Sequence, residues 1–150
     1  MTEITTIEGY NVVINNVTFD GGTTNAIGDD GGTNDPYTVF TVTGVVAMRL
    51  FGYCTTLLSS AGGGTLIVGT AITTSGLLAQ TTATDIDANE IWHDASPDAS
   101  VELFSVATEK IVSQNVIMTV GTADITSGIV KFICLWRPLS PGASVVSTGA

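Results

Sequence analysis

Apolar and polar residues alternate in short runs along most of this chain. Because successive side chains of a β-strand point to opposite faces, runs with a period of two predict strands with one buried face. The runs are separated by stretches rich in Gly, Asp, Asn, Ser and Pro, which favour turns. The expected strands are residues 10–19, 37–43, 45–55, 65–70, 76–80, 86–93, 100–106, 110–113, 115–121 and 128–137.

Strands this short and numerous, in a chain of 150 residues, are typical of two antiparallel sheets packed face to face. We therefore expect an all-β fold, a single-domain antiparallel β-sandwich or jelly roll. Only residues 83–89 and 106–112 have a pattern compatible with a helical turn. Gly44 and Gly52 interrupt a long strand-forming stretch, and either could mark a bulge or a corner between sheets.

The two ends of the chain differ from its strand-rich middle. Residues 1–9 are mostly polar and are expected to form an N-terminal arm that becomes ordered against a partner; the alternative, for both ends of the chain, is a frayed terminus without a role. Residues 10–137 form the expected sandwich domain. Pro138 and Pro141 indicate that the last core strand ends near Trp136, so residues 138–150 are expected to be an extended C-terminal tail and a second candidate arm. The long loop at residues 20–36 is rich in Gly, Asp and Asn.

The net charge of the chain limits the classes of binding partner that we expect. The formal net charge is −10, only 12% of the residues are charged, and the four basic residues are scattered. Nucleic acid and anionic membrane surfaces are therefore not expected as partners, because both need clustered Lys and Arg. The negative charge is compatible with colloidal solubility or with attachment to a basic surface. The low charge density favours packing between subunits.

The N-terminal residues and the positions of the two cysteines indicate the cellular compartment in which the chain is made. The first residues lack the basic region and apolar core of a signal peptide, and no apolar run approaches the roughly 20 residues of a membrane helix. Synthesis in a cytoplasm is the expectation. Cys54 and Cys134 lie on the apolar faces of their expected strands, so we expect both to be buried, reduced and inert.

The densest polar cluster surrounds the single histidine. It consists of Asp85, Asp87, Glu90, His93, Asp94 and Asp98, with Trp92 beside it. Residues 85–96 superficially resemble a calcium loop, but they lack the glycine at position six and the glutamate at position twelve of an EF-hand. A divalent ion is one interpretation of this cluster. The other is structural, with Asp85 and Asp87 on an exposed strand face and Asp94 or Asp98 capping a turn.

Other candidate chemistry is sparse. Ser96, Ser100 or Cys54 could stand beside His93, yet no nucleophile elbow is present and nothing marks an activated thiolate. The Asp-rich residues 29–35 could bind calcium or form a plain turn-rich loop, and residues 62–64 are expected to form a flexible hairpin. Trp92 is the one candidate for an exposed aromatic that stacks on sugars, whereas Trp136 lies on a core face. We expect no enzyme, and we assign no catalytic, cofactor or metal residue.

Three segments carry a resemblance. Residues 79–99 (AQTTATDIDANEIWHDASPDA), 27–36 (IGDDGGTNDP) and 132–139 (FICLWRPL) resemble segments that recur in small proteins of tailed bacteriophages. The similarity covers about residues 20–140. In size, acidity and expected fold, the chain is similar to the capsid decoration, or cement, proteins of these phages.

This resemblance implies a jelly-roll-like domain, commonly trimeric, bound outside the phage head between capsomers. The implied partners are the major capsid protein and two further copies of the chain, and the implied location is the exterior of a virion whose proteins are made in the bacterial cytoplasm. No binding residue can be transferred from so divergent a class. A tail, fibre or baseplate component, or a module that binds host glycans, is the alternative.

Overall fold

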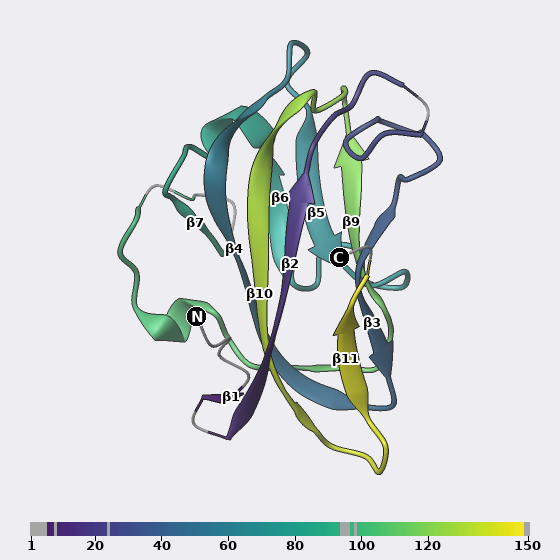
Figure 1. Cartoon of the computed structure of the whole chain (residues 1–150), viewed down its shortest axis with the longest axis vertical. Helices are drawn as coiled ribbons and strands as arrows, with labels where there is room; N and C mark the ends of the chain where they lie inside the picture. Colours follow the sequence, from purple (N-terminus) through teal and green to yellow (C-terminus); the bar gives the residue numbers. More distant parts are fainter. Residues whose placement is uncertain (1–5, 8, 24, 94–96, 98, 149–150) are drawn as a thin grey trace.

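Two antiparallel sheets pack face to face in the computed structural model, which describes residues 6, 7, 9–23, 25–93, 97 and 99–148 (Figure 1). Sheet A has the order β1-β2-β10-β4-β7, with β8 also paired to β4. Its strands are β1 (Thr6–Ile7), β2 (Tyr10–Thr18), β10 (Ser127–Pro138), β4 (Val46–Ser59), β7 (Ile91–Trp92) and β8 (Lys110–Val112). The expected all-β sandwich is confirmed.

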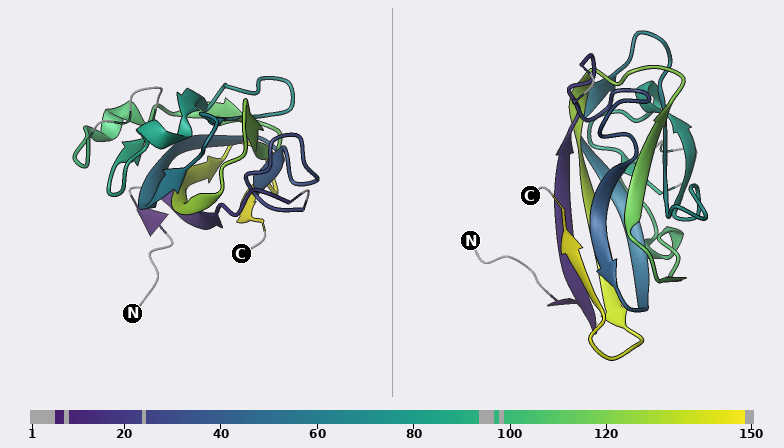
Figure 2. Two further views of the ribbon diagram at one scale, coloured as in Figure 1. Left: turned by 90° about the horizontal axis from the view of Figure 1, so that it is seen from above. Right: turned by 90° about the vertical axis from the view of Figure 1, so that its right-hand side faces the viewer.

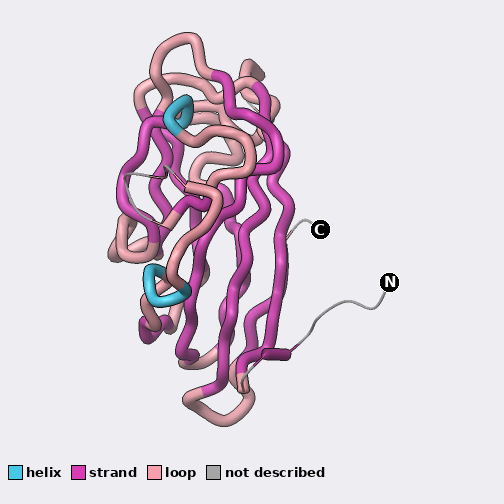
Figure 3. The backbone as a smooth tube through the Cα atoms, turned by 90° about the vertical axis from the view of Figure 1, so that its left-hand side faces the viewer, coloured by secondary structure: helices cyan, strands magenta, loops and turns pink. Residues whose placement is uncertain are grey.

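Sheet B lies behind sheet A in the view of Figure 1 and has the order β11-β3-β9-β5-β6. Its strands are β11 (Ser144–Ser147), β3 (Tyr37–Thr43), β9 (Val116–Gly121), β5 (Thr65–Gly69) and β6 (Leu78–Thr82). Two short 3-10 helices, η1 (Ala83–Asp85) and η2 (Phe104–Val106), lie in connections between strands (Figure 3). Figure 2 shows the two layers from above and from the side.

The core lies between the inner faces of the sheets, as the period-two pattern predicts. In β4 the residues Met48, Leu50 and Cys54 are buried, and in β10 Phe132 and Cys134 are buried. They belong to one apolar cluster with residues of sheet B, among which Phe40, Leu66 and Met118 are completely buried. Trp136 is partly buried against the same cluster, which confirms its expected place on the core face.

Two of the expected strands are wrong in whole or in part. Residues 100–106 form no strand; they are a loop that ends in η2. Of residues 86–93 only Ile91–Trp92 pair with β4, because Asn89 adopts a positive φ of 71° and a turn precedes the strand. Alternation alone does not show whether a short run has a neighbour with which to pair.

The glycines at residues 44 and 62–64 both mark passages between the sheets. Gly44 has a φ of 69° and connects β3 of sheet B to β4 of sheet A, so of the two alternatives, a bulge or a corner, it marks a corner. Gly52 marks neither, because it lies in the uninterrupted part of the register between β4 and β10. Residues 62–64 connect β4 of sheet A to β5 of sheet B, so the expectation of a hairpin is wrong. A side chain at Gly64 would meet the Ala123 carbonyl oxygen at 2.5 Å, so the connection packs closely at this point.

The C-terminal tail is partly a strand. Ser144–Ser147 form β11, which pairs with residues 40–43 of β3, so this part of the expected arm belongs to sheet B. The Asn15 side chain donates to the carbonyls of Val39 and Thr148 at 2.9 Å each, which joins β2 of sheet A to the end of β11. At the other terminus Thr6–Ile7 pair with β2, and the rest of the expected N-terminal arm up to residue 8 lies outside the described residues.

Candidate functional site

Among the described residues of the polar cluster around His93, Asp85 and Asp87 lie apart from the pair formed by His93 and Glu102. His93 Nε2 lies 3.6 Å from Glu102 Oε2, and Glu90 accepts a hydrogen bond from the Asp87 backbone at 2.8 Å. Asp85 and Asp87 are exposed, but they lie in η1 and the turn after it and not on a strand. Asp94, Ser96 and Asp98 lie outside the described residues. Within the described part of the chain, no group of three or more His, Cys, Asp and Glu side chains is placed to hold a metal ion.

Trp92 is buried, so its expected role as an exposed sugar-stacking aromatic is wrong. It is 0% exposed, its indole nitrogen donates to Thr81 Oγ1 at 3.0 Å, and its ring lies 5.9 Å from that of Phe132. The register explains this position, because Trp92 pairs with Gly52 on the inner face of β4. A side chain at Gly52 would meet the Trp92 ring at 3.3 Å, so glycine leaves room for the indole.

The Asp-rich loop at residues 29–35 is held by hydrogen bonds between carboxylate side chains and backbone amides, within the loop and to β9 and the residues after it. Asp35 accepts hydrogen bonds from the amides of Gly31 and Val120, at 2.8 and 2.9 Å. Asp124 accepts from the Asp30 amide at 2.8 Å and so ties the loop to the end of β9. These carboxylates stabilise turns.

Both cysteines are free and buried, as expected. Burial raises the pKa of Cys54 to about 11 and that of Cys134 to about 12. A nucleophilic cysteine needs a lowered pKa. The environment of Cys54 therefore works against thiolate chemistry.

A different surface stands out, on the side of sheet A that faces away from the core. In an antiparallel sheet with one face packed on the core and the other in solvent, each strand usually alternates apolar residues on the core side with polar residues on the solvent side. Here the outer face is also apolar and aromatic. Three cross-strand rows run over β2, β10 and β4: Val12, Leu135 and Arg49; Ile14, Ile133 and Phe51; and Asn16, Lys131 and Tyr53. We call this surface the sheet A face.

The sheet A face is partly exposed in the single chain. Val12, Ile14, Ile133, Phe51 and Tyr53 are each partly exposed, whereas Leu135 is buried. Contiguous apolar patches on a monomer mark interaction surfaces. Aromatic residues and Arg are enriched at the centre of protein interfaces, where Lys, Glu and Asp are depleted. The rows on this face have such a composition, with Lys131 as the exception.

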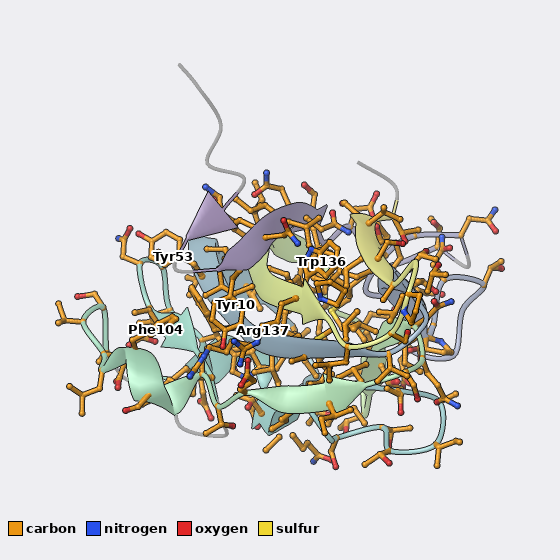
Figure 4. All side chains as sticks on the ribbon, turned by 90° about the horizontal axis from the view of Figure 1, so that it is seen from below. Tyr10, Tyr53, Phe104, Trp136 and Arg137 are labelled. Carbon is orange, nitrogen blue, oxygen red and sulfur yellow. The ribbon has the colours of Figure 1, made fainter. Side chains whose placement is uncertain are left out.

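The lower end of the face holds an aromatic and guanidinium cluster (Figure 4). The Arg137 guanidinium lies 5.1 Å from the Tyr10 ring centroid, and that of Arg49 lies 5.0 Å from the Phe104 ring centroid. Arg49 also donates to the Ala107 carbonyl at 2.8 Å. These contacts hold the loop that contains η2 against β4, β10 and β2.

Glu109 completes this cluster. It accepts a hydrogen bond from the Tyr10 hydroxyl and forms an ion pair with Arg137 at 2.9 Å. The Tyr10 hydrogen bond, and after it the hydrogen bond and charge of Arg137, lower the pKa of Glu109. The carboxylate is therefore ionised at neutral pH and neutralises part of the positive charge of both arginines.

A small apolar pocket lies beside the cluster. Its volume is about 150 Å³, and it is lined mainly by Phe51 and Ile91 of sheet A and by Leu103, Phe104 and Val106 of the η2 loop. Leu103 and Phe104 are 76% and 51% exposed. The η2 loop thus presents apolar side chains to solvent next to an apolar pocket.

The sequence held a signal for the sheet A face. In residues 46–54 one set of alternating positions, Met48, Leu50 and Cys54, predicts the core side. The other set contains Arg49, Phe51 and Tyr53, which a solvated strand face rarely carries together. The cross-strand partners of these residues on β10 and β2 follow only from the register in the structure.

The fold and this surface define a two-sheet sandwich with an apolar, aromatic outer face. Comparisons of the chain with protein-family models, with curated proteins and with solved structures find no match. Among the described residues, no helix has the length and apolar character needed to cross a membrane.

Proposed function

We propose that this chain is a non-enzymatic structural protein of a tailed-phage virion, a head decoration protein. It binds the outer surface of the capsid as an oligomer, contacts the major capsid protein and stabilises the shell. The observation that supports this proposal best is the sheet A face, because its apolar rows and arginines suit contact with another protein. The resemblance of residues 27–36, 79–99 and 132–139 to phage proteins supplies the virion context.

The chemistry of decoration needs protein contacts and no reaction. A protein that binds the assembled shell better than its separated subunits stabilises the shell by mass action. An oligomer placed on a symmetry axis makes several equivalent contacts, so that modest individual affinities combine through effective concentration.

Co-sedimentation tests the proposal. The purified protein is mixed with empty heads built from the major capsid protein of the phage that encodes this chain, and bound protein is measured per head. Saturable binding with a fixed stoichiometry, together with heads that melt at a higher temperature, supports decoration. A protein that stays in the supernatant at all concentrations contradicts it and favours the tail, fibre or glycan-binding alternative.

A further inference from the structure

The sheet A face carries positive charge on an acidic chain. Arg49, Lys131 and Arg137 are three of the four basic residues, and Glu109 is the carboxylate paired among them. Among the described residues of the face and its cluster, these three cations and Glu109 leave a net charge of +2, with Glu102 at the edge in the pocket beside Phe51, whereas the chain as a whole carries −10. The remaining surface of the molecule is therefore strongly acidic.

Lys131 sets a condition on any partner that covers this face. Lys131 lies on the central strand β10, between its register partners Asn16 and Tyr53. Among the described residues, ion pairs join Arg137 to Glu109 and His93 to Glu102, and Lys131 belongs to neither of them. An ammonium group covered by apolar surface without a counter-charge is strongly unfavourable. The partner must therefore bring a carboxylate to Lys131 as well as apolar side chains to the rows around it.

Two identical sheet A faces do not meet this condition. Placed against each other, they would bring two surfaces of charge +2 together, and like charges across an interface are costly. A second copy can meet the condition only with a different, acidic part of its surface. Such a contact is head to tail, and it closes into a ring when the rotation between copies allows.

The η2 loop supplies a surface of this kind. Val101 and Leu103 are 85% and 76% exposed. Glu102 lies between them in the sequence; its side chain is one-quarter exposed and its Oε2 lies 3.6 Å from His93 Nε2, so in the contact its carboxylate has to serve the imidazole and a partner's ammonium group together. The described residues 99–109, which follow β7 and contain η2, lie at the margin of the sandwich beside β4 and β7 (Figure 1).

We propose that the sheet A face of one copy binds residues 101–103 of a second copy, with Glu102 of that copy opposite Lys131. Val101 and Leu103 cover the apolar rows around Ile133 and Phe51, and the carboxylate supplies the counter-charge that the ammonium group needs. The inference deepens the proposed function and rests on it for the claim that copies of the chain work as an oligomer.

Charge reversal tests the contact without any phage head. Light scattering over a range of protein concentrations measures the mass of the native chain and of the variants Lys131→Glu and Glu102→Lys. Each single variant should raise the dissociation constant of the oligomer at least tenfold, because like charges then face each other. The double variant, which carries Lys131→Glu and Glu102→Lys in the same chain, should assemble again, because every contact between its copies then pairs one carboxylate with one ammonium group in a ring of any size.

Two further variants control this experiment. Thr119→Glu places the same new charge on the outer side of sheet B and should leave the mass unchanged. Val101→Ser combined with Leu103→Ser should weaken assembly at constant charge. Circular dichroism and thermal melting establish that each variant is folded.

The outcomes separate this inference from the proposed function. A native chain that is monomeric at every concentration, single variants that assemble normally, or a double variant that remains monomeric would each overturn the contact. Head binding is measured independently by co-sedimentation. Assembly that follows the charge-reversal pattern without any binding to heads would leave the contact standing and overturn decoration.

Discussion

At the scale of single residues, Trp92 shows how neighbours in sequence can mislead about environment. Acidic residues and a histidine surround it along the chain, and this composition predicts exposure. Its pairing with Gly52 places it on the inner face of sheet A instead, where Thr81 accepts its N–H. A glycine paired with a large aromatic indicates that the aromatic ring is buried over it, but the sequence does not show which residues are paired.

Replacing Trp92 should reduce stability and leave the sheet A face in place. Trp92→Ala removes a completely buried ring, and we expect the free energy of unfolding to fall by about 3–5 kcal/mol, measured by urea denaturation. Trp92→Phe, which keeps most of the ring contact with Phe132 but loses the hydrogen bond to Thr81, should lose less. A stable Trp92→Ala protein that had lost a binding activity would contradict the structural role.

The thiols of Cys54 and Cys134 should not react with a thiol reagent in the native protein. Burial raises the pKa of Cys54 to about 11 and of Cys134 to about 12, so both remain protonated at pH 8. We expect no reaction with a thiol reagent at this pH until urea is added, and then two thiols per chain. Rapid labelling of either cysteine in the folded protein would contradict the burial.

The same raised pKa values predict the dependence of stability on alkaline pH. Below the ordinary thiol pKa of 9.0, folded and unfolded chains both keep their thiol protons, so this contribution does not vary. Above it the unfolded chain loses protons that the native chain retains, and stability falls as the pH rises towards 11. Urea denaturation at pH 8 and pH 10 should show this loss, and a variant with alanine at both cysteines should show less of it.

At the scale of elements, the long strands were predictable and some short ones, such as β8 at Lys110–Val112, were too, whereas β11 was missed and β7 was predicted only as part of a longer strand. Residues 45–55 and 128–137 contain enough alternation to predict β4 and β10, and the structure extends both. β7 and β11 are two and four residues long, and they exist because β4 and β3 offer them a backbone partner. The sheet A face escaped prediction for the same reason, since it consists of rows from three strands far apart in the sequence.

Asn15 should matter to the sandwich more than a strand asparagine usually does. Its side chain donates to the Val39 and Thr148 carbonyls and so connects the two sheets. Asn15→Ala leaves both carbonyls without this donor, and we expect a loss of about 1–3 kcal/mol in the free energy of unfolding. Asn16→Ala, on the exposed side of the same strand, is the matched control and should have little effect.

At the scale of the whole molecule, charge and apolar surface are segregated. The described loops at residues 20–35 and 85–90 carry many of the carboxylates, while the sheet A face collects three of the four basic residues. An acidic body with one positive, apolar face is suited to directed association between unlike surfaces. This arrangement underlies both proposals made above.

Deletion of residues 1–9 should separate attachment from folding. Among the described residues it removes only β1, which pairs with Tyr10 and Asn11 at the end of β2, so the melting temperature should change by only a few degrees. Under the decoration proposal, co-sedimentation with heads should weaken, because the expected arm is lost. Unchanged binding by the shortened chain would remove the arm from the binding model.

The place of β10 in sheet A has a consequence for how the chain is made. β10 lies between β2 and β4 and pairs with both along most of its length, yet it begins only at Ser127. During synthesis, β2 and β4 leave the ribosome long before the strand that joins them. Contacts between residues so distant in sequence form slowly, and the unpaired apolar strands are open to aggregation until they do. The nascent chain should therefore depend on chaperones until about residue 138 has emerged.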